Sequence, residues 1–262
     1  MRRLCFLVCL LLCLLNSPLC AADKSIVIRV LSYNIKHGEG VNGKVDISRA
    51  ARVIKSVNPD IVALQEVDSG TKRTDRVDQP TVLGELTGMK VMFGDNIDFE
   101  GGRYGNAVLS RLPIMRTQNH RLPSFYNGEQ RGLFEIEVKP RGSKSSFLFF
   151  ATHLDYRPAD HERVASASLI NELVASRGDV AALLVGDLNS EPGSRPMQQL
   201  LQRWRRTNAE TMFTFPSPIP VKQIDYVLYY PAQRWCVLET KVIDEPIVSD
   251  HRPVLAVLKF CP

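Results

Sequence analysis

The chain has 262 residues, of which 44% are hydrophobic and 23% are charged. Its 33 Lys and Arg residues only slightly exceed its 28 Asp and Glu residues, and the net charge of +5 falls short of the basic surplus of a dedicated nucleic-acid-binding protein. No low-complexity linker or shift in composition divides the sequence. We therefore expect one large domain with an extensive hydrophobic core.

Residues 1–22 have the pattern of a secretory signal peptide. Two arginines form a basic start, an uninterrupted apolar stretch follows from Leu4 to Leu15, and small residues surround a cleavage position after Ala22. The apolar stretch is too short for a resident membrane-spanning helix. We expect a secreted or periplasmic protein whose mature chain, 23–262, has a net charge of +3, because both arginines are lost. A lipoprotein acylated at Cys20 is the alternative.

Cys236 and Cys261 are the two cysteines of the predicted mature chain, because the other four of the six lie within residues 1–22. An even pair of cysteines in an oxidising compartment predicts one disulfide. It would join the segment around Cys236 to the C-terminal strand. Two isolated thiols are the alternative.

Short apolar runs alternate with helical patterns along the mature chain, which is typical of an α/β protein. Within 160–176, apolar side chains recur at the spacing of a helix. Asn58-Pro59 is expected to end the first helix, and Arg177-Gly178 the third. In chain order, strands are predicted at 25–34, 60–67, 106–110, 132–138, 146–153, 181–187, 224–230, 235–243 and 253–260. Helices are predicted at 46–57, 79–87, 160–176 and 194–203.

The segment GEGVNGKV at 38–45, between the first strand and the first helix, is one residue away from a phosphate-binding P-loop. Val45 stands where such a loop needs the hydroxyl that binds Mg²⁺. The glycines are therefore assigned to a turn that leads into the helix beginning near Asp46.

A strand, a helix and a second strand with polar residues at its end occur twice in the sequence. Asn34 and Glu66 end the two strands of the first copy, and His153 and Asp187 those of the second. Ligands of α/β proteins gather at the carboxyl ends of strands. We therefore expect each copy to contribute polar side chains to a functional site.

Glu66 follows an almost unbroken apolar strand, where a carboxylate is costly to bury unless it is paired or holds a cation. Asp187 and Asn189 lie on either side of Leu188, and an Asp whose carboxylate is fixed by a neighbouring amide can orient and deprotonate a water molecule. A structural salt bridge is the alternative for Glu66.

Asp225 enters another apolar strand, and Asp250-His251 directly precedes the last one. An Asp–His pair can hold an imidazole in one protonation state. No G-x-S-x-G motif is present, so a nucleophilic serine has no candidate. Hard oxygen ligands without cysteine suit Mg²⁺ or Mn²⁺, and the remaining His and Asp groups suit acid–base chemistry.

The segments SYNIK, LQEVD, YGNAVLSR, THLD, GDLNS, IDYV and SDHRPV occur in this order across residues 32–254. This series resembles the endonuclease/exonuclease/phosphatase superfamily of DNase-I-like metal-dependent phosphohydrolases. The longer strings LQEVDSGTKRTDRVDQ, GGRYGNAVLSRLPI and EQRGLFEIEV resemble its compact secreted bacterial metal-dependent hydrolases. The resemblance implies a four-layer αββα sandwich, with two mixed β-sheets packed face to face and helices outside. It makes 23–262 the catalytic domain.

The resemblance also implies roles for particular residues. The implied metal set is Asn34, Glu66 and Asp250. The implied catalytic set is His153, Asp187, Asn189, Asp225 and His251. Asp187 would activate water, with Asn189 orienting it or holding substrate. His251, paired with Asp225, would contact the scissile phosphate, and His153 would hold another phosphate oxygen.

Six further residues in the longer strings are candidates for the substrate side. They are Arg73, Arg76, Arg103, Tyr104, Asn106 and Arg131. Solvated loop charges or buried structural pairs are the alternative for each of them.

The resemblance leads us to expect a secreted Mg²⁺- or Mn²⁺-dependent phosphohydrolase, a monomeric phosphodiesterase that uses in-line attack by water. A secreted DNase or RNase is one alternative, and WRR at 204–206 could then join a basic groove. A phosphoesterase acting on membrane lipid head groups is another, with MFTFPSPIP at 212–220 as the membrane contact. A binding module without turnover is the alternative from a different class.

Overall fold

The first of two six-stranded sheets is built around the N-terminal strand. The computed structural model describes residues 25–126 and 128–262, so the predicted signal peptide at 1–22 lies outside the described residues. The strand order of this sheet is β11-β12-β1-β2-β4-β3. Its strands are β1 (Ile26–Asn34), β2 (Ile61–Ser69), β3 (Lys90–Phe99), β4 (Gly102–Ser110), β11 (Trp235–Val242) and β12 (Val254–Phe260). Only β1 and β2 run parallel among the described pairs of this sheet, and α1 (Ile47–Val57) connects them.

The second sheet has the order β5-β6-β7-β8-β10-β9. Its strands are β5 (Ile114–Arg121), β6 (Gly132–Val138), β7 (Phe147–His153), β8 (Ala182–Asp187), β9 (Arg205–Arg206) and β10 (Asp225–Tyr230). The parallel pair here is β7 and β8, connected by α3 (His161–Ser176). The predicted repeat is therefore confirmed as two βαβ units, one in each sheet.

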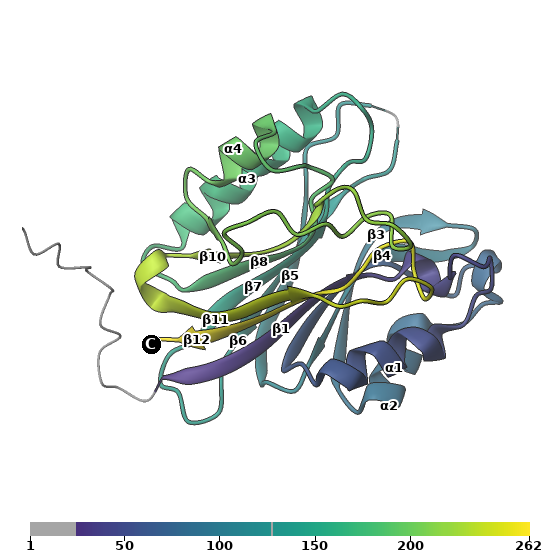
Figure 1. Ribbon diagram of the computed structural model, residues 1–262, viewed down its shortest axis with the longest axis horizontal. Coiled ribbons are helices and arrows are strands. Elements are labelled where there is room, and N and C mark those ends of the chain that lie inside the picture. The colour runs from purple at the N-terminus through teal and green to yellow at the C-terminus, as the bar shows by residue number, and fades with distance from the viewer. Residues whose placement is uncertain (1–24, 127) are drawn as a thin grey trace, which may run out of the picture.

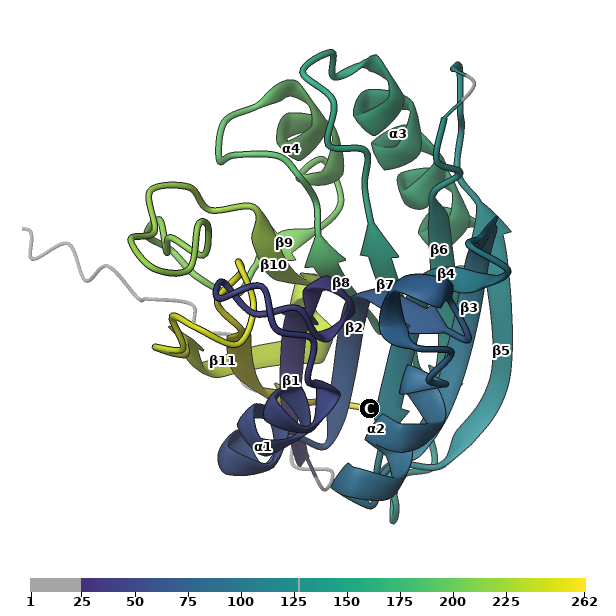
Figure 2. The same ribbon diagram turned by 90° about the vertical axis from the view of Figure 1, so that its right-hand side faces the viewer.

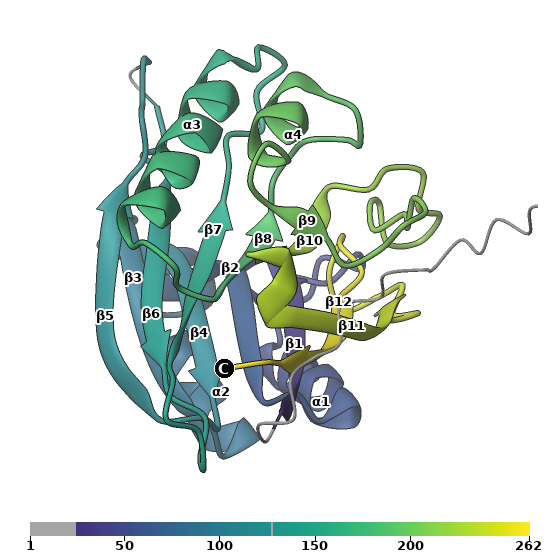
Figure 3. The same ribbon diagram turned by 90° about the vertical axis from the view of Figure 1, so that its left-hand side faces the viewer.

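Helices cover the outer face of each sheet. Figure 1 shows α1 and α2 (Gln79–Thr87) on one side of the sandwich and α3 and α4 (Arg195–Leu200) on the other. Figures 2 and 3, seen from the two ends of Figure 1, show both sheets between these helix layers. The predicted four-layer αββα sandwich is confirmed. Among the described residues, none of the helices is long and apolar enough to span a membrane.

Alternating side chains along the strands separate three hydrophobic layers. On β1, Ile28 and Val30 pack between the two sheets, whereas Leu31 and Tyr33 pack beneath α1. Successive side chains of a strand point to opposite faces, so a strand buried on both faces needs an almost continuous apolar run. The strand predictions succeeded where such runs occur.

Local signals define the first helix and the turn before it. The side chain of Asp46 accepts a hydrogen bond from the backbone N–H of Ser48, and Asn58 ends α1 in the left-handed conformation. The backbone N–H of Gly40 donates to the carbonyl of Lys44 within 38–45. The segment that nearly matches a P-loop is therefore a turn, and some of its backbone N–H groups donate to carbonyl oxygens of the same turn.

Three strands were not predicted: β3, β5 and β9. Both β3 and β5 are outer strands of their sheets, and most side chains of β5 are exposed or half-buried. Edge strands commonly carry charged and polar residues that discourage pairing with other chains, so they lack a clear apolar pattern. The third, β9, has only two residues.

The predicted disulfide between Cys236 and Cys261 is wrong, because Cys236 is an exposed free thiol. Cys236 pairs in register with Lys259, two residues before Cys261. Diagonal neighbours of this kind have Cα atoms about 7–8 Å apart, whereas most disulfides need about 4.4–6.8 Å. The register of β11 against β12 therefore keeps these two sulfur atoms apart.

Glu135 is a buried carboxylate on β6 that contacts two arginines and a histidine. Its oxygens lie 2.7 Å from His120 Nε2, 2.6 Å from Arg116 Nη2 and 2.9 Å from Arg177 Nη2. Burial alone would raise the pKa of Glu135, but the hydrogen bonds from His120 and Arg177 and the nearby positive charges outweigh it and hold that pKa below its usual value of 4.5.

We expect Glu135→Gln to lower the free energy of unfolding by about 2 kcal/mol at neutral pH, because charge-assisted hydrogen bonds are lost. The folded-state pKa of Glu135 is depressed, so its stabilisation is fully present above about pH 4.5 and is lost as pH falls through the folded-state value. Urea unfolding of both proteins at several pH values measures this difference. A difference that grows as the pH falls below 4.5 would contradict it.

Candidate active site

The ends of strands from both sheets meet at one edge of the sandwich. Asn34 at the end of β1 donates from Nδ2 to Glu66 Oε1 at 3.0 Å, and to Asp187 Oδ2 of the other sheet at 3.1 Å. Antiparallel strands β10 and β12 begin where the parallel strands end, which brings Asp225 and His251 to the same edge. The amide of Asn34 therefore links the two βαβ units.

Glu66 occupies a bulge in β2. The pairing of β2 with β4 shifts between Leu64 and Val67, and Glu66 adopts a φ of 57°. Bulges redirect side chains and are frequent next to active sites, and a left-handed conformation is uncommon for a residue other than glycine. The bulge coincides with the placement of the Glu66 carboxylate beside Asn34, where it lines a cavity.

Asp187 is held in a buried position at the end of β8. Gly186 precedes it with a φ of 152°, and a Cβ there would lie 1.9 Å from the carbonyl oxygen of Thr152, so only glycine fits. Asp187 Oδ1 accepts from the backbone N–H of Asn189 at 2.9 Å. Burial raises the pKa of Asp187 to about 7, although the positive charge of His251 opposes this rise.

Asn189 has a structural contact of its own. It adopts a φ of 45°, and its Nδ2 donates to the carbonyl of Leu154 at 3.0 Å. Its backbone therefore fixes Asp187, while its side chain ties β8 to the segment that follows β7.

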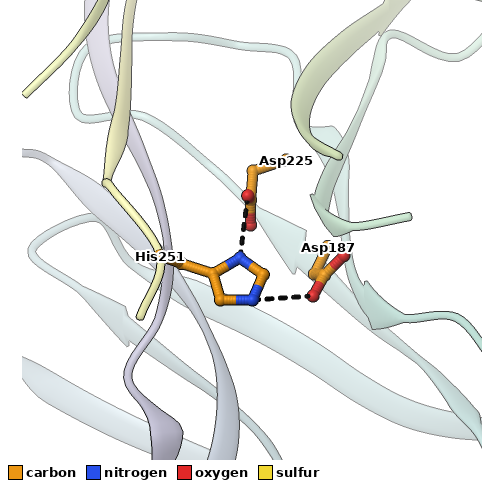
Figure 4. A group of neighbouring side chains, drawn as sticks. All are labelled: Asp187, Asp225 and His251. Atoms are coloured by element: carbon orange, nitrogen blue, oxygen red, sulfur yellow. Dashed lines mark hydrogen bonds and ion pairs between the residues drawn. The ribbon is translucent and has the colours of Figure 1, made fainter. Parts of the chain in front are cut away.

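His251 lies between two carboxylates. Its Nδ1 is 2.9 Å from Asp225 Oδ2 and its Nε2 is 3.7 Å from Asp187 Oδ2 (Figure 4). Burial alone would lower the pKa of His251, but the two negative charges outweigh burial and raise that pKa to about 10. His251 is therefore an imidazolium at neutral pH, and its ring packs against Phe215 with ring centroids 4.8 Å apart.

His153 differs from His251 because a cation, the guanidinium of Arg131, contacts one side of its ring. Arg131 Nη1 lies 3.1 Å from His153 Nδ1. An arginine only donates, so Nδ1 must accept and the proton must sit on Nε2. That nitrogen lies 3.4 Å from Asp187 Oδ2. Burial and the charges of Arg131 and His251 hold the pKa of His153 well below its usual value of 6.5, so the ring is a neutral donor.

The oxygen donors near Glu66 fit a hard divalent cation. Glu66 has no ion-pair partner among the described residues, and Asp250 lines the same cavity with a 3.8 Å ion pair to Lys36. Two weakly compensated carboxylates that line one cavity favour a cation such as Mg²⁺ or Mn²⁺. Asn34 Oδ1 accepts from the backbone N–H of Lys36, so this side chain positions Glu66 and Asp187 through Nδ2.

A second group of potential metal ligands consists of Asp187, Asp225 and His251. Their ligand atoms all lie within 4.8 Å of one another. In this arrangement Nδ1 of His251 already donates to Asp225. The group is therefore arranged as a chain of one hydrogen bond and one ion pair, and the donors that remain for a cation are those of Glu66 and Asp250.

A cavity of about 760 Å³ opens over these residues. Of the predicted substrate-side residues, Tyr104 and Arg131 line it, whereas Arg73, Arg76, Arg103 and Asn106 do not. Arg73 instead forms two hydrogen bonds, at 2.7 and 2.8 Å, to the buried carboxylate of Asp68. Arg103 pairs with Asp95 and Asp98 on the surface.

The remaining two of these residues bond to backbone carbonyls. Asn106 is buried and donates to Gly132, and Arg76 donates to Gly70 and Glu100. Side-chain pairing of this kind was the structural alternative for these positions. Their charge or amide is therefore engaged away from the cavity.

Most of the other residues that line the cavity were not predicted for the site, among them Glu129, Phe215 and Lys222. Glu129 Oε1 lies 2.5 Å from Arg131 Nη1, and burial raises the pKa of Glu129. The string EQRGL contains both members of this pair, of which only the arginine was predicted. Lys222 makes no ion pair among the described residues, and no pattern in the sequence singles it out.

Comparisons with known proteins agree with this fold. The sequence model of the Endonuclease/Exonuclease/phosphatase family matches residues 31–251. YbhP of Escherichia coli strain K12 is 25% identical over 242 residues, covering 87% of this chain and 94% of YbhP. A solved structure of an endonuclease/exonuclease/phosphatase family protein from Bacteroides thetaiotaomicron has a TM-score of 0.76 at 20% identity, covering 91% of this chain and 99% of that one. The mannosyl-6-phosphatase Bt3783 of the same species has a TM-score of 0.74 at 20% identity, covering 88% and 99%.

The chain belongs to the Endonuclease/Exonuclease/phosphatase family, whose model spans most of its length. Members of this family act on phosphate esters and use divalent metal ions. The two structural likenesses, at 20% identity, bear on the fold alone. The predicted family is confirmed.

Proposed function

We propose that the protein is a divalent-metal-dependent phosphodiesterase that cleaves a P–O bond by in-line attack of water. The observation that carries this proposal is the placement of Asp187 between the amide of Asn34 and the imidazolium of His251, at the floor of the cavity. A buried carboxylate with a pKa near neutrality is suited to accept a proton from water. The charged Nε2–H of His251 and the neutral Nε2–H of His153 both lie near Asp187 Oδ2.

The chain's own residues would then divide the chemistry as follows. Asp187 orients a water molecule and takes its proton as the water oxygen bonds to phosphorus and the bond to the leaving oxygen breaks. The leaving oxygen takes a proton from solvent in the cavity. His251 offers a charged N–H and His153 a neutral N–H to the phosphate oxygens, where negative charge develops.

Glu66 and Asp250 would hold the divalent cation, with Asn34 positioning Glu66. When bound, Mg²⁺ or Mn²⁺ supplies Lewis acidity and charge neutralisation to the phosphate. The hard oxygen donors fit either ion.

The charges of the cavity favour a diester over a polyanion. Six acidic side chains line it, against four Lys or Arg side chains. The acidic ones are Glu66, Glu129, Asp160, Asp187, Glu191 and Asp250, and the basic ones are Arg131, Arg157, Arg163 and Lys222. A groove for DNA or RNA neutralises phosphates with a surplus of Lys and Arg, so a secreted nuclease is the weaker candidate.

The other candidate functions are a binding module without turnover and a phosphoesterase that acts on membrane lipid head groups. A binding module without turnover does not require the chain of polar contacts from Asp225 through His251 to Asp187. For a phosphoesterase acting on membrane lipid head groups, Phe213 and Ile219 in 212–220 are exposed. Cleavage after residue 22, a secreted or periplasmic location and a monomeric state stay predictions.

We expect metal-depleted protein to be inactive on bis(p-nitrophenyl) phosphate and to regain turnover when Mg²⁺ or Mn²⁺ is added. Glu66→Gln should raise the metal concentration needed for half-maximal activity about 10-fold or more, because it removes a charged ligand. Glu85→Gln on the surface of α2 is the matched control. Turnover that persists in excess chelator, or no turnover with either metal, would sink the proposal.

A further inference from the structure

The cavity extends well beyond the reacting groups, towards the loops before α3 and α4. We call this part the polar wall and define it by Tyr156, Arg163, Ser190 and Ser194. Ligand sites of about 300–1,000 Å³ accommodate whole small molecules, and the volume of about 760 Å³ falls in that range. The reacting phosphate therefore fills only part of the cavity.

Three buried polar atoms of the polar wall have no hydrogen-bond partner among the described residues. They are Ser190 Oγ, Ser194 Oγ and Arg163 Nε. Ser190 is 3% exposed and Arg163 8% exposed. A buried donor or acceptor left unpaired costs about 1–3 kcal/mol, and buried polar groups are almost always paired with protein, water or ligand. These atoms therefore suit a ligand with several hydrogen-bonding groups.

The charges around the polar wall are already neutralised within the protein. Arg157 lies 2.8 Å from Asp155 Oδ1 and 2.6 Å from Glu162 Oε2. Arg163 lies 3.9 Å from Asp155 Oδ2 and donates from Nη1 to the carbonyl oxygens of Asp155 and Arg157, and Asp160 pairs with Arg195. A second phosphate would find little free positive charge here, whereas a neutral group with hydroxyls meets donors and acceptors together.

Tyr156 adds a flat surface at the edge of the polar wall. It is 68% exposed, and the guanidinium of Arg131 lies 5.8 Å from the centre of its ring. An aromatic face carries partial negative charge and attracts the C–H groups of a ring laid against it. Arg131 also bonds His153, so Tyr156 stands next to the reacting groups.

We propose that the polar wall binds a hydroxyl-rich group, a sugar or cyclic polyol, that is esterified to the phosphate being hydrolysed. The inference rests on the proposed phosphodiesterase function and names its substrate class. The same chemistry occurs in a free sugar or polyol phosphodiester and in a glycosyl or inositol lipid head group, so the experiment separates these two sources.

The test measures kcat/KM in Mg²⁺ for glycerophosphoinositol, for phosphatidylinositol in vesicles, for single-stranded DNA and for bis(p-nitrophenyl) phosphate. One inositol substrate is expected to be preferred over bis(p-nitrophenyl) phosphate and DNA. In Ser190→Ala/Ser194→Ala, this preference over bis(p-nitrophenyl) phosphate should fall about 10-fold or more, because two hydroxyl partners are lost. Ser168→Ala, on the outer side of α3, is the matched control and should leave the preference unchanged.

Tyr156→Ala is a second variant, at an exposed position that the fold tolerates, and should lower the same preference. Cleavage of only the vesicle substrate identifies a lipid head group, and cleavage of only the soluble diester identifies a free polyol ester; both support the proposal. Three results would overturn this inference alone, provided that bis(p-nitrophenyl) phosphate is turned over. The enzyme could show no preference for either inositol substrate, or it could prefer DNA. The serine and tyrosine variants could also leave the preference for inositol substrates intact. Absence of all turnover overturns the proposed function as well.

Discussion

Asp187→Asn is expected to lower kcat on bis(p-nitrophenyl) phosphate by about 10³-fold at saturating Mg²⁺, because a general base typically contributes about 10²–10⁴-fold. That loss corresponds to about 4 kcal/mol of transition-state stabilisation. An asparagine keeps the volume of the side chain and an oxygen that can accept from the backbone of Asn189. It cannot take the proton of the attacking water. The loss should therefore appear in kcat, and circular dichroism should show an unchanged fold.

The matched control for this experiment is Asp179→Asn, a surface carboxylate paired with Arg234. It should leave kcat within twofold of the natural protein. A normal kcat for Asp187→Asn, combined with a higher metal requirement, would instead make Asp187 a metal ligand. A loss of less than 10-fold in kcat would contradict its role as the base.

The architecture was accessible from the sequence because most strands are buried on both faces. Strands such as β7 and β8 read as continuous apolar runs, and each is followed by polar residues where the chain leaves the core. The two βαβ units follow from this pattern and from the helical spacing between the runs. Outer strands such as β3 and β5 escaped prediction, since a strand at the edge of a sheet is specified by its neighbour more than by its own apolar pattern.

The site was accessible only in outline. Strand-end positions brought together Asn34, Glu66 and Asp187, but the bulge that places Glu66 depends on pairing with β4 and leaves no local signal. The contrast between a charged His251 and a neutral His153 was also beyond the sequence. It arises because one ring lies between two carboxylates, whereas the other lies between an arginine and the carboxylate of Asp187, which are contacts between distant segments.

The substrate side was the least predictable part. Arg73 and Arg103 were candidates by their charge, yet each has acidic partners that neutralise it. Whether a charge is free for a ligand depends on such partners, and spacing along the chain does not reveal them. Ser190 ends the segment GDLNS and Ser194 lies in no motif, and only the burial of their hydroxyls without partners among the described residues draws attention to these two side chains.

Asp225→Asn is expected to lower kcat by about 10²–10³-fold, although Asp225 does not line the cavity. Its Oδ2 accepts the Nδ1 proton of His251 at 2.9 Å, and its Oδ1 is buried without a partner among the described residues. The direct contact by which Asp225 can act on the cavity is therefore its hydrogen bond to His251. An amide removes the negative charge that keeps His251 protonated, so the phosphate would meet a neutral and less firmly oriented ring. Steady-state kinetics with bis(p-nitrophenyl) phosphate measures the loss.

A double-mutant cycle distinguishes this positioning role from a general loss of structure. If Asp225 acts through His251, then Asp225→Asn should cost less than threefold in kcat once His251→Gln is already present, because residues that act as a unit are not additive. Independent roles would instead multiply the two losses. The control is Asp98→Asn, which changes an exposed carboxylate on β3. It should leave kcat almost unchanged both in the natural protein and in His251→Gln. If the losses in kcat from Asp225→Asn and His251→Gln multiply fully, Asp225 does not act on the phosphate through His251.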